Sequence, residues 1–471
     1  MPFQPLLSAL AASAVLSGCA SIDIEQALGE TNQLTHAFTQ GTLELDRRSP
    51  QHAARALRSE QLLAKPLFMD DAVQLALANG PAVQTLIAQG WADLAAAGQA
   101  GRIANPVFTF ERMRLGDELE LGRLLSIGLL DLLTLPRRQA ISSNQTAQAR
   151  TQLSASVVEQ VSQVRQAWVR AVAARQTLGY AEQVNQAAQA SAELARRMQQ
   201  VGNFSRLQRA RQHAFYADSA AQLASARHAA TAAWEQLVRQ LGLTDTQATQ
   251  LKLPDRLPDL PPQAREPADV RTAALQQRLD VQLARLQLDM AGKSQGLILL
   301  DSLVDVEAGA RRDTVFDKGE KSTRRGYELA VRLPIFDWGG TQRAAMNAQS
   351  FAAASRYDAV VRSASSQLRE SYSAYRTAHD LARHYRDEIV PLRRAMAEEN
   401  VLRYNGMLIG VFELLADTRD QIASVMAAIH AQQQFWLADA ALSSSLIGKP
   451  MSMGTAPVAP ATGNGTQAPG H

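Results

Sequence analysis

The feature that most constrains the fold is a run of about 60 residues that can form one uninterrupted helix. From Gln139 to Met198 there is no proline, and only Gly179 interrupts a composition of Ala, Gln, Arg, Leu and Glu, which favours helices. Apolar residues recur at helical spacing; they include Val157, Val161, Val164, Trp168 and Val172. At ~1.5 Å per residue the helix is about 90 Å long, so the chain predicts a rod rather than a globule.

Two glycine-containing breaks end long helical runs of this kind, at residues 201–203 and 405–407. Each break is followed by a returning helix, over 205–241 and 410–446, of about 55 Å at ~1.5 Å per residue. The returning helices are shorter than their partners. We therefore expect each long helix to pack against two shorter ones laid end to end, the second being the opening helix of each half, at 70–98 and 267–293.

The two halves align without gaps at one offset. Gly202 and Gly406 lie 204 positions apart, and the same register pairs Trp168 with Tyr372 and Ile127 with Val331. Agreement at glycine, aromatic and apolar positions together indicates a tandem duplication.

Strand patterns occur once in each half, between the opening helix and the long helix. In the second half, residues 304–308 and 327–333 alternate apolar with polar, which puts Tyr327, Leu329, Val331 and Leu333 on one face. In the first half, residues 105–113 and 121–134 occupy the same places. Such strands suit a barrel wall between lipid and water and, taken alone, a soluble sandwich equally well. The connectivity favours the barrel, because the strands lie at one end of each rod and the glycine turns at the other.

The only cysteine follows a short apolar run and the residues Leu16-Ser17-Gly18. This pattern predicts a signal peptide over residues 1–18 and acylation of Cys19, for example with palmitate. Ala20 and Ser21 after the cysteine are typical of sorting to the outer membrane in Gram-negative lipoproteins. An ordinary signal peptide or a buried helix is the alternative, because residues 1–5 lack the usual Lys or Arg.

The remaining divisions follow composition. Residues 19–66 are expected to form a lipidated arm, 67–246 the first repeat, 247–266 a linker, 267–447 the second repeat, and 448–471 a disordered tail rich in Gly, Pro, Ala, Ser and Thr. Basic and acidic residues are interleaved and the formal net charge is only +3. No nucleic-acid-binding surface is therefore predicted.

At this point the sequence resembles the TolC-like outer-membrane factor family, lipoprotein type, over residues 70–446. The most specific piece is the segment 333–343, which is similar to the family's junction between strand and helix in the second repeat. Its marked residues are Pro334, Asp337, Trp338, Gly339 and Gly340. The first repeat has Pro136 with Arg137 and Arg138 there instead, which puts symmetric geometry in doubt.

A second piece, residues 403–406 followed by 413–415, is similar to the tip of the family's second helical hairpin. The resemblance implies that both tips dock with an adaptor and close the duct at rest. The docking residues would be Gly202, Asn203, Asn405 and Gly406. The gate candidates beside them are Arg403, Tyr404, Glu413, Asp417 and Arg419, with Arg206 and Arg209 in the first repeat.

The resemblance implies a mainly α fold with a small β part: long helical hairpins forming an α-barrel, and four transmembrane β-strands per protomer that complete a barrel in a homotrimer. It implies an exit duct of a tripartite efflux system, a passive conduit for small toxic compounds or metal ions. The duct would lie in the Gram-negative outer membrane, extend into the periplasm, and work with a periplasmic adaptor and an inner-membrane transporter. The alternative is a lipid-anchored periplasmic coiled-coil scaffold without channel activity.

No enzyme, metal site or cofactor is predicted. The pair His379-Asp380, with His384, has neither the spacing nor the Glu of a zinc-protease helix. No glycine-rich phosphate loop occurs in the sequence, so the energy for export must come from a partner.

Overall fold

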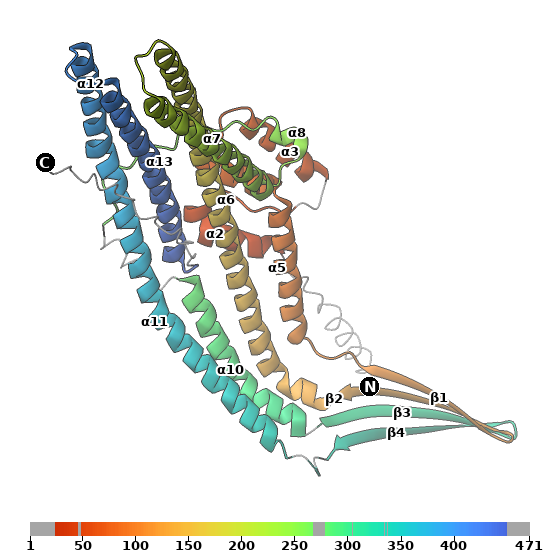
Figure 1. Cartoon of the computed structure of the whole chain (residues 1–471). Coiled ribbons are helices and arrows are strands. Elements are labelled where there is room, and N and C mark those ends of the chain that lie inside the picture. The colour runs from red at the N-terminus through yellow and green to blue at the C-terminus, as the bar shows by residue number, and fades with distance from the viewer. Residues whose placement is uncertain are drawn as a thin grey trace.

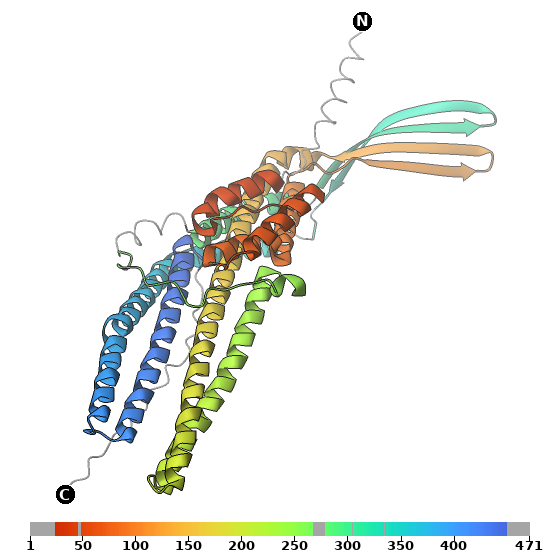
Figure 2. The ribbon, with the colours of Figure 1, turned by 90° about the horizontal axis from the view of Figure 1, so that it is seen from above.

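The computed structural model describes residues 24–45, 49–266, 278–303, 305–333, 335–336 and 338–449. Long helices run side by side and form an elongated body, and a narrow sheet projects from one end of it (Figure 1). The view from above shows two helical hairpins that extend away from the sheet and end in separate tips (Figure 2). The rod expected from the long helical run is confirmed.

The first half contains six main elements besides its short N-terminal helices. They are α4 (Met69–Asn79), α5 (Pro81–Ala100), the strands β1 (Val107–Leu115) and β2 (Glu118–Gly128), α6 (Leu129–Gln200) and α7 (Arg206–Leu241), followed by the short α8 (Asp245–Ala248). The second half repeats this order. Its elements are α10 (Leu279–Leu303), β3 (Asp305–Asp317), β4 (Glu320–Arg332), α11 (Gly340–His384), the π-helical turn η1 (Tyr385–Ile389), α12 (Val390–Asn405) and α13 (Val411–Ile447).

Each long helix packs against two shorter ones, as expected. Helix α6 contacts α7 along one part and α5 along another, and the α11–α12 helix contacts α13 and α10 in the same way. The tandem repeat predicted from the 204-residue offset is thus confirmed in the order of the elements. The opening helix expected over 267–293 corresponds to α10, which begins at Leu279 and continues past residue 293 to Leu303; residues 267–277 lie outside the described residues.

Helix α6 begins earlier than expected, so the strand predicted over 121–134 is wrong beyond Gly128. The segment from Leu129 onward is helical, and Thr134 in its second turn donates its hydroxyl to the carbonyl of Leu130 at 2.8 Å. Pro136 lies inside this helix as its eighth residue; it has no amide hydrogen to donate to the carbonyl of Leu132, so one helical hydrogen bond is missing there. The strand prediction failed beyond Gly128 because a short apolar run fits a strand and a helix equally well.

The second long helix carries an irregularity that the first lacks. The five residues of η1 form a π-helical turn, and Pro391 follows it two residues later. A proline ring displaces the carbonyl four residues before it, and a π-turn is one way for a helix to absorb that displacement. The position equivalent to Pro391 in α6 is Ala187, and α6 continues there without a break.

The N-terminal arm is more structured than its weak periodicity indicated. It contains α2 (Ile24–Thr39) and α3 (Ser49–Leu63), and α2 packs on α6 while α3 packs on α4. Their apolar residues join the largest core cluster of the molecule, which also contains Trp168. The indole of Trp168 is fully buried and donates to the carbonyl of Leu67 at 2.8 Å.

The linker after α8 crosses the body in extended form and is held by the second half. Leu251, Leu253 and Leu257 are buried, and the side chains of Gln432 and Trp436 in α13 both donate to the carbonyl of Pro258, at 2.7 and 3.0 Å. The linker therefore ties the two hairpins together near the middle of the molecule.

The sheet is an antiparallel meander in the order β1-β2-β3-β4. Its register is constant along every pair, without a bulge: Phe108 pairs with Leu125, Leu125 with Ala310, and Ala310 with Tyr327. Because side chains alternate between faces, this register assigns every described strand residue to one of two faces. The strands β3 and β4 are longer than the expected segments 304–308 and 327–333. The prediction missed their charged halves because those halves lack an apolar alternation.

Candidate functional site

The two faces of the sheet differ in charge. One face, which we call the acidic face, carries all eight carboxylates found among the described side chains of the four strands. They are Glu111, Glu118, Glu120, Glu307, Asp313, Asp317, Glu320 and Glu328. The basic residues on that face are Arg311, Arg324 and Arg332.

An ion-pair network braces the acidic face across the sheet. Arg311 of β3 contacts Asp313 at 3.0 Å, Glu111 of β1 at 3.1 Å and Glu328 of β4 at 3.8 Å. Between Glu111 and Asp313 lies Gly122 of β2. A Cβ atom at Gly122 would come within 3.3 Å of both neighbours, so the glycine leaves the space in which Arg311 reaches across.

The opposite face, which we call the apolar face, bears Tyr327, Leu329 and Val331 in β4 and continues through Leu125 and Phe108 in the neighbouring strands. These side chains are exposed, Tyr327 to 93%. The face shared by Tyr327, Leu329 and Val331 was expected from the sequence and is confirmed. Leu333, expected on the same face, follows the end of β4 at Arg332 and is also exposed.

The junction between β4 and α11 continues the exposed apolar surface. Leu333, Ile335, Phe336 and Trp338 are all exposed, Phe336 to 99%; Pro334 and Asp337 lie outside the described residues. Gly339 takes a left-handed conformation with φ of +71°, and its carbonyl accepts from the amide of Arg343 at 2.9 Å. Gly340 begins α11 and is not left-handed. Only one glycine of the pair is therefore needed for the turn.

The tip of the first hairpin turns at its glycine. Gly202 has φ of +81°, and the amides of Asn203 and Phe204 both reach back to the carbonyl of Met198, at 2.9 and 3.2 Å. Ser205 then caps α7 by a reciprocal exchange with Gln208. The turn is thus a glycine-terminated helix end joined directly to a capped helix start.

The tip of the second hairpin does not use its glycine in this way. Gly406 has φ of −80°, whereas Met407 takes the left-handed conformation with φ of +57°. The amide of Leu408 closes the turn on the carbonyl of Arg403 at 2.8 Å. Gly406 therefore does not supply the left-handed residue of this turn, and the aligned glycines occupy different places in the two turns.

The charged gate candidates do not form one group. Arg403, Tyr404 and Glu413 are exposed near the second tip, and Asp417 is half-buried. Of the first-repeat candidates, Arg206 is exposed, and Arg209 donates to Gln199 across its own hairpin at 3.0 Å.

Arg419 has a distinct environment, because it joins the two hairpins. Its guanidinium lies 4.2 Å from the ring centre of Phe215 in α7 and donates to Gln212 at 3.3 Å. Burial lowers the pKa of Arg419, and Asp218 opposes that shift. Sequence reasoning placed Arg419 near the tip but could not identify Gln212 and Phe215 as its partners, because they lie on the other hairpin.

Both tips expose large apolar side chains. At the first they are Val201 and Leu207; at the second they are Leu402, Met407 and Leu408, with Met407 exposed to 92%. The docking candidates Gly202, Asn203, Asn405 and Gly406 lie among them and are exposed. Cys19 lies outside the described residues.

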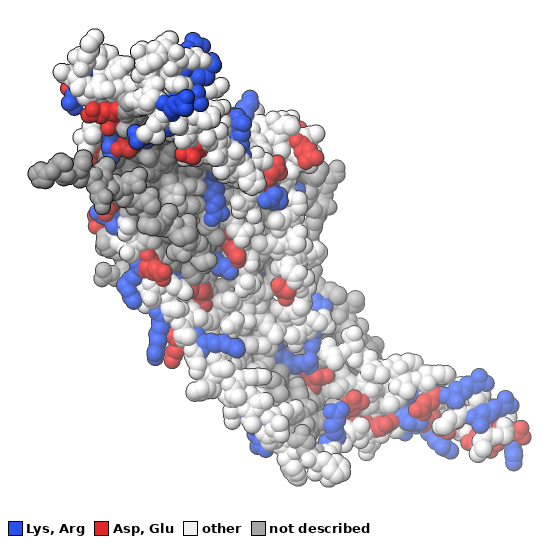
Figure 3. Space-filling model, viewed as in Figure 1, with Lys and Arg blue, Asp and Glu red and all other residues white. Residues whose placement is uncertain are grey.

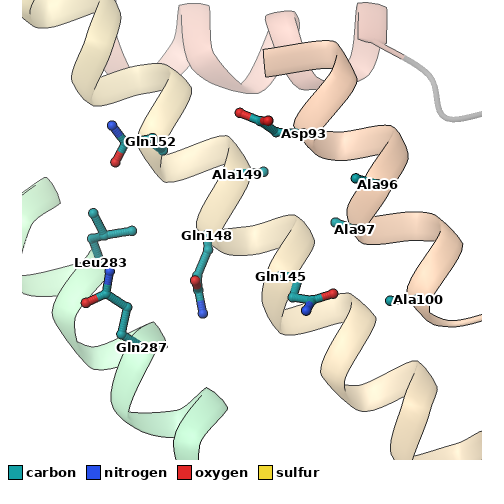
Figure 4. A pocket seen from close by; sticks show the side chains of 10 residues that line it. All are labelled: Asp93, Ala96, Ala97, Ala100, Gln145, Gln148, Ala149, Gln152, Leu283 and Gln287. Carbon is teal, nitrogen blue, oxygen red and sulfur yellow. The ribbon is translucent and has the colours of Figure 1, made fainter. Parts of the chain in front are cut away.

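A groove of about 470 Å³ runs beside α6 between α5 and α10 (Figure 4). Alanine and glutamine form most of its lining, and Asp93 is the only titratable residue among the lining side chains. The groove therefore offers no pair of groups for acid-base chemistry. Within the described part of the chain, no cluster of three or more His, Cys, Asp or Glu suits a metal ion. The same residues include no helix with the length and hydropathy of a membrane span.

No family model matches the chain, and no curated protein does. Solved structures do match. The outer membrane protein VceC from Vibrio cholerae is 16% identical with a TM-score of 0.66, and the match covers 81% of this chain and 96% of that one. The outer membrane channel CmeC from Campylobacter jejuni is 13% identical with a TM-score of 0.65 over 84% and 86%. The open-state outer membrane channel MtrE from Neisseria gonorrhoeae is 17% identical with a TM-score of 0.63 over 83% and 90%.

The similarity therefore extends over most of both chains. The chain has the fold of these outer-membrane channel proteins. The mainly α fold with a small β part, expected from the resemblance to TolC-like outer-membrane factors, is confirmed.

Proposed function

We propose that this chain, which has the fold of outer-membrane channel proteins, is one subunit of a trimeric passive duct through the Gram-negative outer membrane. The observation that carries the proposal is the four-stranded sheet with one exposed apolar face and one acidic face. A soluble sheet of this size would cover its apolar face with another layer. Here no described element covers it.

The apolar face suits lipid in its extent as well as its composition. From Tyr327 through Leu333 and on to the aromatic residues Phe336 and Trp338, every large apolar residue is exposed. At ~3.4 Å per residue, the extended backbone from Arg325 to Leu333 spans about 27 Å, close to the ~25 Å apolar band of transmembrane barrels. The acidic face on the other side would line an aqueous lumen.

Four strands cannot enclose a lumen, and the sheet leaves β1 and β4 as open edges. Unpaired edges of long strands are sites for pairing with another chain. Three copies placed edge to edge supply twelve strands, which close into a barrel wide enough for an aqueous pore. The trimer therefore satisfies the strand edges and separates the two faces.

The second long helix supports the same assembly. It exposes apolar side chains that no described element covers; they are Phe351, Val361, Leu381, Leu392, Met396, Val401 and Leu402. An exposed apolar surface of this kind marks a contact with another protein. A neighbouring subunit in a ring would cover it, and the helical hairpins would then continue the barrel as an α-helical tube.

The tube would extend into the periplasm, because its charged and polar helices cannot lie in lipid. Its far end carries the exposed apolar residues of both tips, and we propose that these contact a periplasmic adaptor. The residues in the turns are Gly202, Asn203, Asn405 and Gly406. Since the sequence contains no phosphate-binding loop, an inner-membrane transporter would supply the energy, and the chain itself would not be an enzyme.

The gate would lie near the second tip, where Arg403, Tyr404 and Glu413 are exposed and Asp417 is half-buried. Arg419 would act differently, by holding the second hairpin against the first through Gln212 and Phe215. Cys19 would anchor the subunit to the outer membrane through its acyl chains, in addition to the strands.

The acidic face favours cationic cargo. Eight carboxylates against three arginines in each subunit would give the lumen a negative potential, and rings of carboxylates select cations. Small cationic toxic compounds or metal ions are the cargo classes that this charge suits.

Conductance in planar lipid bilayers tests the proposal. Purified protein should run as a trimer, form channels and show a reversal potential on the cation side in a salt gradient. Replacing Glu120 and Glu328 by Gln should move that potential toward zero, whereas replacing Glu398 and Glu399 of α12, which lie away from the sheet, should not. A monomer that forms no channels would contradict the duct.

The variant Cys19→Ser distinguishes the duct from the alternative, a lipid-anchored scaffold. A duct should stay in the outer-membrane fraction through its strands, whereas a scaffold should appear in the soluble periplasmic fraction.

A further inference from the structure

The apolar face of the sheet carries a second feature, a cluster of cations without a carboxylate. The residues are Arg112, Arg114, Arg123, Arg312, Lys321 and Arg325. Every acidic residue among the described strand side chains points to the other face. We call these six residues the basic belt.

The register places the belt in three adjacent rows. Arg123, Arg312 and Arg325 pair directly and lie side by side on β2, β3 and β4, with neighbouring strands ~4.8 Å apart. Arg112 belongs to the next row toward the hairpin turns, and Arg114 and Lys321 belong to the row after it. Figure 3 shows many basic residues, with acidic residues among them, on the part of the sheet that is far from the helices.

The cations of the belt are not neutralised within the subunit. Arg112, Arg114, Arg312, Lys321 and Arg325 are exposed and Arg123 is half-buried. Within the described residues none of them has a carboxylate within ion-pair distance; Lys321 lies near the ring of Phe316, at 5.9 Å from its centre. Arg311 on the acidic face, by contrast, contacts three carboxylates.

The belt also lies at the boundary of the apolar surface. Tyr327, Leu329 and Val331 fill the same face between the belt and the helices, and Phe108, Phe110 and Tyr327 lie next to the first row of arginines. Aromatic residues mark the edge of the apolar band in transmembrane barrels. An arginine facing lipid is tolerated at that edge and is unfavourable at the midplane, so the belt marks the level of the lipid headgroups.

We propose that the basic belt binds a multiply phosphorylated glycolipid of the outer leaflet through its phosphate groups. This inference rests on the proposed function, which puts the hairpin turns on the outer side of the membrane. Arginine pairs with phosphate by two parallel hydrogen bonds. Six cations in three adjacent rows exceed what one phosphodiester can neutralise, and they match a headgroup with several phosphates held close together.

The test uses the full-length trimer in bicelles. Three lipids are added as probes: bis-phosphorylated lipid A, the same lipid without its phosphates, and phosphatidylglycerol. Binding is measured by native mass spectrometry and by titrating each lipid into the trimer at two salt concentrations. The parent should prefer bis-phosphorylated lipid A over both other probes, and the preference should weaken with salt.

The variant R123Q/R312Q/R325Q should bind bis-phosphorylated lipid A at least about tenfold more weakly, because three charge-assisted contacts are lost. A matched control, R324Q/R356Q/R362Q, removes three exposed arginines outside the belt and should bind like the parent. The variant R123K/R312K/R325K keeps the charge and should recover part of the binding, which excludes loss of folding as the cause.

The outcomes separate the inference from the proposed function. Equal binding of lipid A with and without phosphates, equal or tighter binding of phosphatidylglycerol, or equal binding by the belt variant and its control would overturn the inference while leaving a conducting trimer intact. Failure of the parent to insert into vesicles and conduct would overturn both.

Discussion

The two long helices come from the same repeat, yet one is covered and the other is not. Helix α6 is surrounded by α2, α4, α5, α7, α10 and α13, and its residues 153–173 are largely buried. In α11 and α12 together, few side chains are buried, and they face α10 and α13. The first half has recruited the N-terminal helices as a cover, and the second half has none among the described elements.

The difference indicates where the subunit is complete and where it needs a neighbour. An apolar stripe covered from within stabilises the monomer. An exposed apolar stripe does not add to the stability of the isolated subunit, but it provides a surface for association with a neighbour. We therefore expect substitutions in the first half to change stability and substitutions in the second half to change assembly.

The largest expected effect is loss of the trimer. Leu392 and Met396 lie one turn apart and are exposed on the second long helix; the variant L392E/M396E should place charges in the subunit interface and give monomers by size exclusion with multi-angle scattering. The control R394E/E398R inverts an ion pair on the opposite face of the helix and should remain trimeric. Trimeric L392E/M396E would refute the assignment of this surface to a neighbour.

The next largest effect is a loss of stability, which we compare at two positions related by the 204-residue offset. Trp168→Ala removes a fully buried indole and its hydrogen bond, and should lower the unfolding free energy by about 3–5 kcal/mol. Tyr372→Ala removes a half-buried ring whose hydroxyl donates to the carbonyl of Arg265, and should lower it by only about 1 kcal/mol. Denaturant titration followed by circular dichroism measures both. Equal losses would contradict the difference in cover between the halves.

A third prediction concerns the buried charges that join the halves. Asp439 of α13 pairs with Arg265 at 3.0 Å, but its burial outweighs the attraction of Arg265 and Arg165 and raises the pKa of Asp439. The folded state therefore keeps the proton to a higher pH than the unfolded chain does. The contribution of Asp439 to the unfolding free energy should fall as pH rises from about 4 through the raised pKa, by about 1.4 kcal/mol per unit of pKa difference.

Thermal unfolding of the parent and of Asp439→Asn at several pH values from 4 to 8 checks this slope. Relative to the Asn variant, the parent should lose stability as pH rises, whereas the exposed control Asp255→Asn should follow the parent. A parent that instead gains stability relative to the Asn variant over this range would show that the Arg265 pairing dominates.

The smallest effect distinguishes the two tips. Gly202→Ala puts a Cβ on a left-handed residue and should lower the unfolding free energy by about 1 kcal/mol. Gly406→Ala should be almost neutral, because Gly406 is not left-handed and a Cβ there would meet only ordinary contacts. Met407→Gly should raise the unfolding free energy by up to about 1 kcal/mol. Melting temperatures of the three variants give the order, and a larger loss for Gly406→Ala than for Gly202→Ala would reverse the assignment.

Long-range periodicity made most of the helical architecture predictable. The run from Gln139 to Met198, the two glycine breaks and the constant offset led to the right hairpins, because a helix of that length has few packing solutions. The face containing Tyr327, Leu329 and Val331 was predictable for the same reason, since strict alternation defines a strand face.

Other features depend on contacts between distant segments. Met407 takes the left-handed place because the second turn closes one residue later than the first, and a gapless alignment cannot show this. The partners of Arg419 lie about two hundred residues away in the sequence. The segregation of charge in the sheet appears only once the register assigns Arg123 and Arg312 to one row; a signal was present in the alternation of residues 305–325, but its charged half does not resemble an amphipathic strand.

The pairing of β2 with β3 has a consequence for biogenesis. Leu124 of the first hairpin lies opposite Arg311 of the second, so the central seam of the sheet joins residues separated by most of a repeat. Hairpin β1–β2 can close during synthesis, but its inner edge stays unpaired until the second half of the chain has been made. Until the seam closes, the hairpin carries an unpaired strand edge, which is a site for pairing with other chains.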